Sequence, residues 1–154
     1  DNKIFQNCFK EYISKGYIGT EKIAFLKAIL LRNHGKDVKP MLDESNENIG
    51  YLLGRCLACA DKLQYIKYEP RKRLSQVYWN SLLNYPSRVF PRLIEKVNRM
   101  GSLSLFDNLM EKIDDIPVRF TDLDKKNMVL GFYHQRMYFF KNKKNVDQKE
   151  ENVK

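Results

Sequence analysis

One segment near the middle of the chain repeats apolar residues at the spacing of a buried helix face. The repeat runs in steps of three and four residues from Ile49 to Leu63. This spacing aligns side chains along one side of an α-helix, which is stable only when that side is buried. The segment therefore predicts a core helix. We expect Ser45 or Asn46 to cap its start and Tyr65 to lie near its end.

The same periodicity recurs along most of the chain. Further helices are predicted at about residues 4–15, 20–33, 71–83, 87–99, 102–114 and 121–140. Pro91 is expected to be tolerated because it lies in the first turn of its helix, and Thr121 to form a capping box with Asp124. No stretch alternates apolar and polar residues for long enough to predict a strand. The fold class expected is all-α, a bundle of five to seven helices with short connections.

Chain length fits one domain. The 154 residues, of which 43% are hydrophobic and 31% charged, can bury a sufficient core without disulfides. We expect a single helical-bundle domain over residues 1–140. Its last helix should bury a stripe of five residues: Leu123, Leu130, Tyr133, Met137 and Phe140. Residues 141–154 hold only two apolar side chains, Val146 and Val153, and are expected to form a charged, disordered tail.

The cysteines and the lengths of the apolar runs indicate the cellular compartment and whether a metal site is expected. Cys8, Cys56 and Cys59 cannot all pair within one chain, and this low, odd count is typical of a reducing cytosol. No apolar run approaches the roughly 20 residues of a membrane span, and no secretory signal opens the chain. Cys56 and Cys59 form a C-x-x-C pattern inside a helix face, which favours a core role over redox chemistry. A zinc site that adds Cys8 and His34 lacks a second paired motif, so no metal or cofactor is expected.

No catalytic constellation is visible. The two histidines, His34 and His134, do not belong to a Ser-His-Asp pattern, and the chain has neither a paired-carboxylate motif nor a phosphate-binding glycine loop. We therefore expect no enzymatic activity and no small-molecule substrate. His134 is expected at the surface or at a helix interface with its hydrogen bonds satisfied.

The net charge of +9 is concentrated in one part of the chain. Nine basic and two acidic residues lie between Lys62 and Arg99, whereas four basic and six acidic residues lie between Gly101 and Asn127. This distribution predicts one basic face and one neutral-to-acidic face. An excess of this size favours an anionic partner, most commonly nucleic acid, although a charge that serves only solubility is the alternative.

Two groups of basic residues supply most of this charge. Arg88, Arg92, Lys96 and Arg99 follow one another in steps of four, four and three, which places them on one helix face. Lys62, Lys67, Arg71, Lys72 and Arg73 flank an interhelical loop beside several aromatic residues: Tyr65, Tyr68, Tyr78 and Trp79. Phosphates would neutralise such a row, while a solvated face explains it equally well. The aromatic rings could stack on bases, although Tyr78 and Trp79 fit a core role as well.

Four strings in the chain resemble a known family when they are taken together. They are residues 23–33 (IAFLKAILLRN), 51–55 (YLLGR) with 62–64 (KLQ), 87–93 (SRVFPRL) and 130–136 (LGFYHQR). In this order they resemble the C-terminal region of the Csd-type large subunit of type I-C (Dvulg subtype) CRISPR Cascade. The resemblance covers about residues 22–140.

The resemblance implies a role in a prokaryotic, cytoplasmic effector complex. Such C-terminal regions are similar to an internally translated small subunit that lines the belly of the complex and helps hold the R-loop and its displaced strand. The implied partners are the Cascade backbone and large subunits, the guide RNA complex and displaced single-stranded DNA. The candidate nucleic-acid-binding residues are Arg32, Arg55, Lys62, Lys67, Arg71, Arg73, Arg88, Arg92, Lys96, Arg99 and Arg136.

Two other hypotheses remain open at this stage. Arginine is also favoured at protein interfaces, so the basic face could belong to a scaffold domain that meets neighbouring subunits without touching nucleic acid. A small helical RNA-binding protein outside CRISPR systems is the third possibility.

Overall fold

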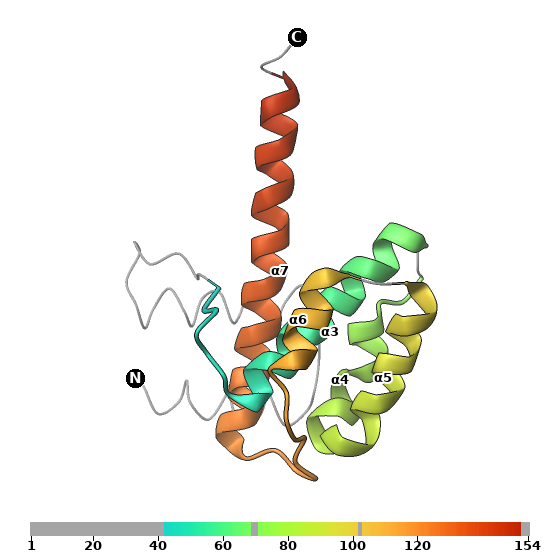
Figure 1. The fold of residues 1–154 in the computed structure, drawn as a ribbon, viewed down its shortest axis with the longest axis vertical. Helices are drawn as coiled ribbons and strands as arrows, with labels where there is room; N and C mark the ends of the chain where they lie inside the picture. Colours follow the sequence, from blue (N-terminus) through green and yellow to red (C-terminus); the bar gives the residue numbers. More distant parts are fainter. Residues whose placement is uncertain (1–41, 69–70, 102, 152–154) are drawn as a thin grey trace.

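The computed structural model describes residues 42–68, 71–101 and 103–151, and side chains as far as Asn142 (Figure 1). The described part contains five helices and no strand, which confirms the prediction of an all-α bundle. They are α3 (Ile49–Lys67), α4 (Leu74–Asn84), α5 (Pro86–Met100), α6 (Ser104–Glu111) and α7 (Asp122–Glu151). The helices predicted near residues 4–15 and 20–33, with Cys8, Arg32 and His34, lie outside the described residues. None of the described helices is long and apolar enough to cross a membrane.

Helix α3 is the centre of the bundle and contacts the other four described helices. Every residue from Gly50 to Ala60 is buried, because α3 is apolar on almost all sides. Its cap is Asn48, whose side chain accepts hydrogen bonds from the backbone N–H groups of Gly50 and Tyr51. The predicted cap at Ser45 or Asn46 is therefore wrong. Both residues belong to the preceding turn, where the Ser45 N–H donates to Asp43 and Asn46 accepts from the Asn48 N–H.

Helices α3 and α7 form the most extensive contact in the bundle, and glycines allow their backbones to touch. A Cβ atom on Gly54 would lie 2.8 Å from the backbone nitrogen of Phe132 and closer still to the carbonyl oxygen of Met128. A Cβ on Gly131 would lie 2.9 Å from the carbonyl carbon of Tyr51. Real Cβ contacts essentially never fall below 3.0 Å. Only glycine therefore fits at this crossing.

Helices α4 and α5 form a hairpin that packs beside α3 (Figure 1). Trp79 of α4 is buried, and its ring meets Phe132 of α7 edge-on at 5.5 Å, so Trp79 belongs to the core. Pro91 is the sixth residue of α5, not a first-turn residue, so the expected reason for its tolerance is wrong. Pro91 is exposed, and its missing N–H leaves the Ser87 carbonyl without its usual helix partner.

Helix α7 begins at the predicted capping box. The Asp124 N–H donates to the Thr121 hydroxyl at 3.1 Å, and the Thr121 N–H donates to the Asp124 carboxylate at 3.0 Å. The predicted apolar stripe is wrong at its ends, because Leu123 and Phe140 are 62% and 51% exposed. The residues that α7 buries most deeply are Met128, Val129, Phe132, Tyr133 and Gln135. This face surrounds Gly131, where the backbone of α3 comes closest.

Helix α7 also continues past the end predicted for it. The helical backbone extends to Glu151, into the region for which we expected a charged, disordered tail. In Figure 1 this extension projects well beyond the other helices. Helix α6 begins at Ser104, and it ends at Glu111, before Ile113 and Pro117.

Candidate nucleic-acid interface

A row of four basic side chains runs along the outer face of α5. Val89, Phe90, Leu93 and Val97 bury the opposite face, while Arg88, Arg92, Lys96 and Arg99 are all exposed. At 1.5 Å per helical residue the row spans roughly 16 Å. The structure thus places these four predicted residues together on one accessible surface, which we call the α5 row.

Local partners neutralise the α5 row only in part. Arg99 forms a 2.6 Å ion pair with Glu95 one turn earlier, but both side chains are largely exposed, so the pair is weak. Lys96 and Arg88 each lie 5.8 Å from an aromatic ring, those of Tyr78 and Tyr85 respectively. These rings fix the direction of the cations without cancelling their charge. Within the described part of the chain, Glu95 is the only carboxylate in salt-bridge distance of the row.

The basic residues of the α3–α4 connection extend this surface. Lys67, Arg71, Lys72 and Arg73 are all exposed. The end of the Lys67 side chain lies beside Gly101, because a Cβ on that glycine would be 3.7 Å from the Lys67 Cε. Gly101 has a φ of 117° and ends α5. The end of α3 and the end of the α5 row are therefore neighbours.

Two of the predicted basic residues, Arg73 and Arg136, influence the buried Asp61. Burial raises the pKa of Asp61, and hydrogen bonds from the Ser75 hydroxyl and N–H partly offset this effect. Arg73 and Arg136 both favour its charged form. Burial lowers the pKa of Arg136, the neighbouring Arg73 lowers it further, and Asp61 opposes both. Asp61 thus caps the start of α4 through Ser75, and its charged form is favoured by both arginines.

Aromatic rings support the basic residues near α7. Lys62 lies 4.1 Å from the Phe139 ring centroid, and the Arg136 guanidinium lies 5.6 Å from that of Phe140. Lys62 and Arg136 are both half-buried. They are therefore less available to an outside anion than the α5 row.

Arg55 lies away from the basic surface. It is 2% exposed between α3 and α7, and its Nε donates to the Gln135 Oε1 at 2.9 Å. The structure does not place Arg55 where an external phosphate can reach it, although the sequence placed it among the candidate contacts. Its neighbour Gln135 is equally buried, and no sequence pattern indicated this polar pair.

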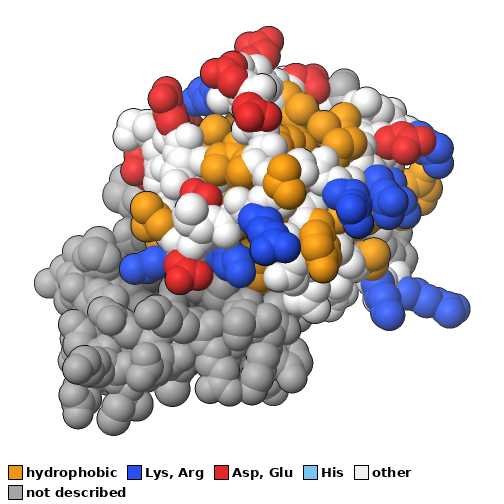
Figure 2. Space-filling view, turned by 90° about the horizontal axis from the view of Figure 1, so that it is seen from below, with side chains coloured by type: hydrophobic (Ala, Val, Ile, Leu, Met, Phe, Trp, Pro, Cys, Tyr) orange, Lys and Arg blue, Asp and Glu red, His pale blue; other side chains and the backbone are white. Residues whose placement is uncertain are grey.

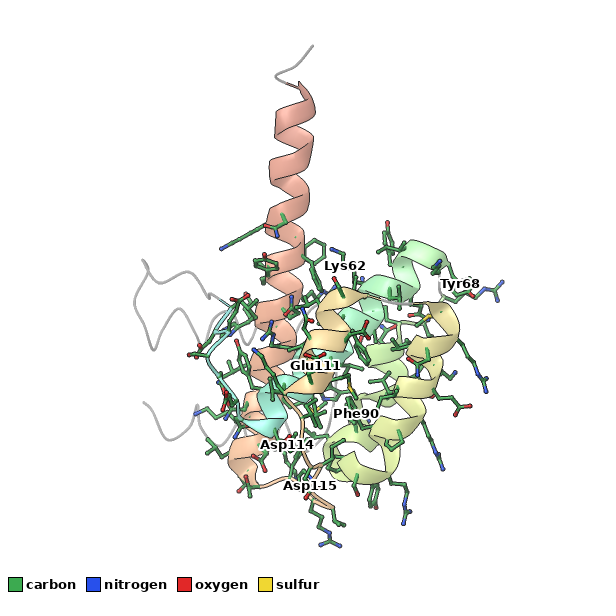
Figure 3. All side chains as sticks on the ribbon, in the orientation of Figure 1. Lys62, Tyr68, Phe90, Glu111, Asp114 and Asp115 are labelled. Carbon is green, nitrogen blue, oxygen red and sulfur yellow. The ribbon has the colours of Figure 1, made fainter. Side chains whose placement is uncertain are left out.

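Acidic residues gather away from the α5 row, as the charge distribution predicted. Glu111 ends α6, and Asp114 and Asp115 follow it in the loop toward α7 (Figure 3). All three are exposed. The space-filling view from below shows several acidic side chains along one margin, and most basic side chains lie elsewhere on that face with a few acidic ones among them (Figure 2).

His134 and the two cysteines have structural surroundings. The Tyr51 hydroxyl accepts from the Asp43 N–H at 2.9 Å and shares a hydrogen bond, also of 2.9 Å, with the His134 Nδ1, whose tautomer determines the donor. This confirms the prediction of a helix-interface histidine. Burial lowers the pKa of His134, and Asp43 partly opposes this shift. Cys56 and Cys59 are both buried, and burial raises the pKa of Cys59 to about 12. This confirms the core role predicted for the C-x-x-C pattern.

Comparison with known proteins adds one positive finding. A family model described as CRISPR-associated protein (Cas_Csd1) matches residues 2–140, most of the chain. No curated protein matches the sequence.

Proposed function

Because the chain belongs to the Csd1 family of CRISPR-associated proteins, we propose that it is a non-catalytic, nucleic-acid-binding subunit of a type I-C Cascade effector complex. In this role it lines the belly of the complex beside the backbone subunits. It stabilises the R-loop by holding the displaced non-target strand.

The observation that carries this proposal is the α5 row. Its four cations are exposed, lie on one helix face and have a single carboxylate in salt-bridge distance among the described residues. R-loop formation is close to energetic balance, so a few backbone contacts from lysine or arginine are enough to shift it. Such contacts do not read sequence and depend strongly on salt.

A second candidate function is a protein scaffold. Val77 and Tyr85 are 54% and 53% exposed on the α4–α5 hairpin, and Arg88 lies over the Tyr85 ring. Exposed aromatic and arginine side chains of this kind are enriched at protein interfaces. On this hypothesis the hairpin contacts neighbouring subunits and does not touch nucleic acid.

Charge reversal of Arg88 and Arg92 to Glu tests the first proposal. With about four phosphates contacted, the slope of log K against log salt for single strands should be near −3, and losing two contacts should reduce it to about −1.4. The matched control is Lys112→Glu with Arg119→Glu, which changes the net charge equally on the acidic side. Both control positions are exposed. We expect only the α5 variant to weaken binding and R-loop formation, with every oligonucleotide recovered uncut in the presence of Mg²⁺.

Co-purification with the other subunits separates the two functions. The nucleic-acid function predicts that the α5 variant assembles but supports R-loops poorly at raised salt. The scaffold function predicts that it fails to enter the complex. A variant that assembles and forms R-loops as well as the parent protein would contradict both.

A further inference from the structure

Two tyrosines at the end of α3 expose most of their ring surface. Tyr65 and Tyr68 are 69% and 60% exposed, and Ile66 between them is 60% exposed. Tyr65 lies in the last turn of α3 and Tyr68 is the C-cap three residues later, so both rings lie at the same end of the helix. Figure 3 shows Tyr68 at the outer end of α3.

These tyrosines differ from the other aromatic residues near the basic surface. Tyr78, Tyr85, Phe139 and Phe140 each lie close to a lysine or arginine side chain. Neither Tyr65 nor Tyr68 has such a cation or an aromatic partner among the described residues. Their faces are open to a ligand.

Basic residues outnumber the single acidic residue, Glu69, in the stretch from Lys62 to Arg73 that holds the two tyrosines. Lys67 lies between them in the chain and rests beside Gly101, two residues after Arg99, the last cation of the α5 row. Arg71 and Lys72 follow on the other side, and both are exposed. Lysine is depleted from the cores of protein interfaces, so this composition favours a polyanion over a protein partner.

We infer that Tyr65 and Tyr68 form a stacking platform for unpaired bases, placed where a strand leaves the end of the α5 row. The inference rests on the proposed function and sharpens its ligand class to single-stranded nucleic acid. Aromatic rings stack on bases regardless of sequence, but only when the bases are not already paired inside a duplex. The α5 row can contact the phosphates of both single-stranded and duplex nucleic acid, whereas the tyrosine platform favours single strands.

The test compares three probes on the full chain: a thymine oligonucleotide, an abasic backbone of the same length, and a duplex. Replacing Tyr65 and Tyr68 together with Ala should weaken thymine binding by about tenfold for each ring that stacks. Abasic and duplex binding should not change, and neither should the salt slope. Tyr65→Phe with Tyr68→Phe keeps both rings and should retain the affinity. Thermal unfolding should match the parent protein, because both side chains are exposed.

Each outcome separates this inference from the function on which it rests. If the double alanine variant binds the thymine oligonucleotide as well as the parent protein does, while the Arg88→Glu and Arg92→Glu variant still has a reduced salt slope, the platform is overturned and the proposed function is not. An equal loss of affinity for all three probes also overturns it, because the abasic probe has no bases on which the rings could stack. Failure of the alanine variant to join the complex, with oligonucleotide binding intact, assigns the tyrosines to a protein contact. A parent protein that binds none of the probes overturns the platform and the proposed function together.

Discussion

Gly54→Ala is expected to destabilise the fold even though alanine is the better helix former. Gly54 lies in the middle of α3, where the backbone of α7 crosses it. A methyl group there would lie 2.8 Å from the Phe132 nitrogen and closer to the Met128 carbonyl oxygen. Both neighbours are backbone atoms inside a helix, so neither can rotate out of the way as a flexible side chain would.

The size of the effect follows from two opposing contributions. The substitution gains up to about 1 kcal/mol of helix propensity. Ordinary van der Waals contact begins near 3.4 Å, so the Phe132 contact alone requires the helices to separate by about 0.6 Å. Overpacking typically costs about 1–3 kcal/mol and more where the surroundings are rigid. Because the clashing atoms are helix backbone, we expect a cost at the upper end of this range and a net loss of about 2 kcal/mol. This loss lowers the melting temperature of a chain this size by roughly 4–8 °C.

Circular dichroism during thermal and urea unfolding measures this loss. Asn98→Ala is the matched control, because Asn98 is an exposed residue within α5. It should leave the free energy of unfolding unchanged or slightly raised. Gly131→Ala approaches the same crossing from α7 and should behave like Gly54→Ala. A Gly54→Ala protein as stable as the parent would refute the close backbone contact between α3 and α7.

Two further predictions concern buried titratable groups. Burial raises the pKa of both Cys56 and Cys59, so little thiolate forms at pH 8, and neither thiol should react with iodoacetamide until urea unfolds the chain. Rapid labelling of either of these two residues in the native protein, located by peptide mass spectrometry, would count against its core role. Because burial lowers the pKa of His134 in the folded state, the unfolded chain binds more protons below about pH 6.5, and stability should fall as the pH drops from 7 toward 5. His134→Gln keeps a hydrogen-bonding side chain beside the Tyr51 hydroxyl, and its urea midpoint should change less between pH 7 and pH 5. If the variant shows the same pH dependence as the parent protein, His134 is not the group responsible.

The helices themselves could be predicted because their signals are local. The apolar spacing of α3, the capping box of Thr121 and Asp124, and the break around Tyr85 each depend on a few neighbouring residues. The start of α3 was harder to predict, because Ser45, Asn46 and Asn48 are all good caps and the choice depends on the turn before them. The buried face of α7 was also harder, since tertiary packing around Gly131 selects it over the alternative stripe.

The candidate site also contains residues whose positions could be predicted from local sequence and others whose positions depend on tertiary contacts. The α5 row could be predicted because one helix fixes the relative positions of all four cations. Arg55 could not be placed, since an arginine in a sequence string looks the same whether it points to solvent or pairs with Gln135 eighty residues later. The cluster of Arg73 and Arg136 around Asp61 likewise requires three separate elements to meet.

The glycine crossing and the basic surface are connected through α3. Its first half is fixed against α7 by Gly50 and Gly54, and its second half extends to the exposed tyrosines beside the end of α5. Asp61 ties the start of α4 to the same helix through Ser75. Helix α3 also packs against α5, so helix packing sets the position of the α5 row relative to the end of α3. A strand that contacts both surfaces meets them at a fixed separation, and binding it requires little ordering of the protein.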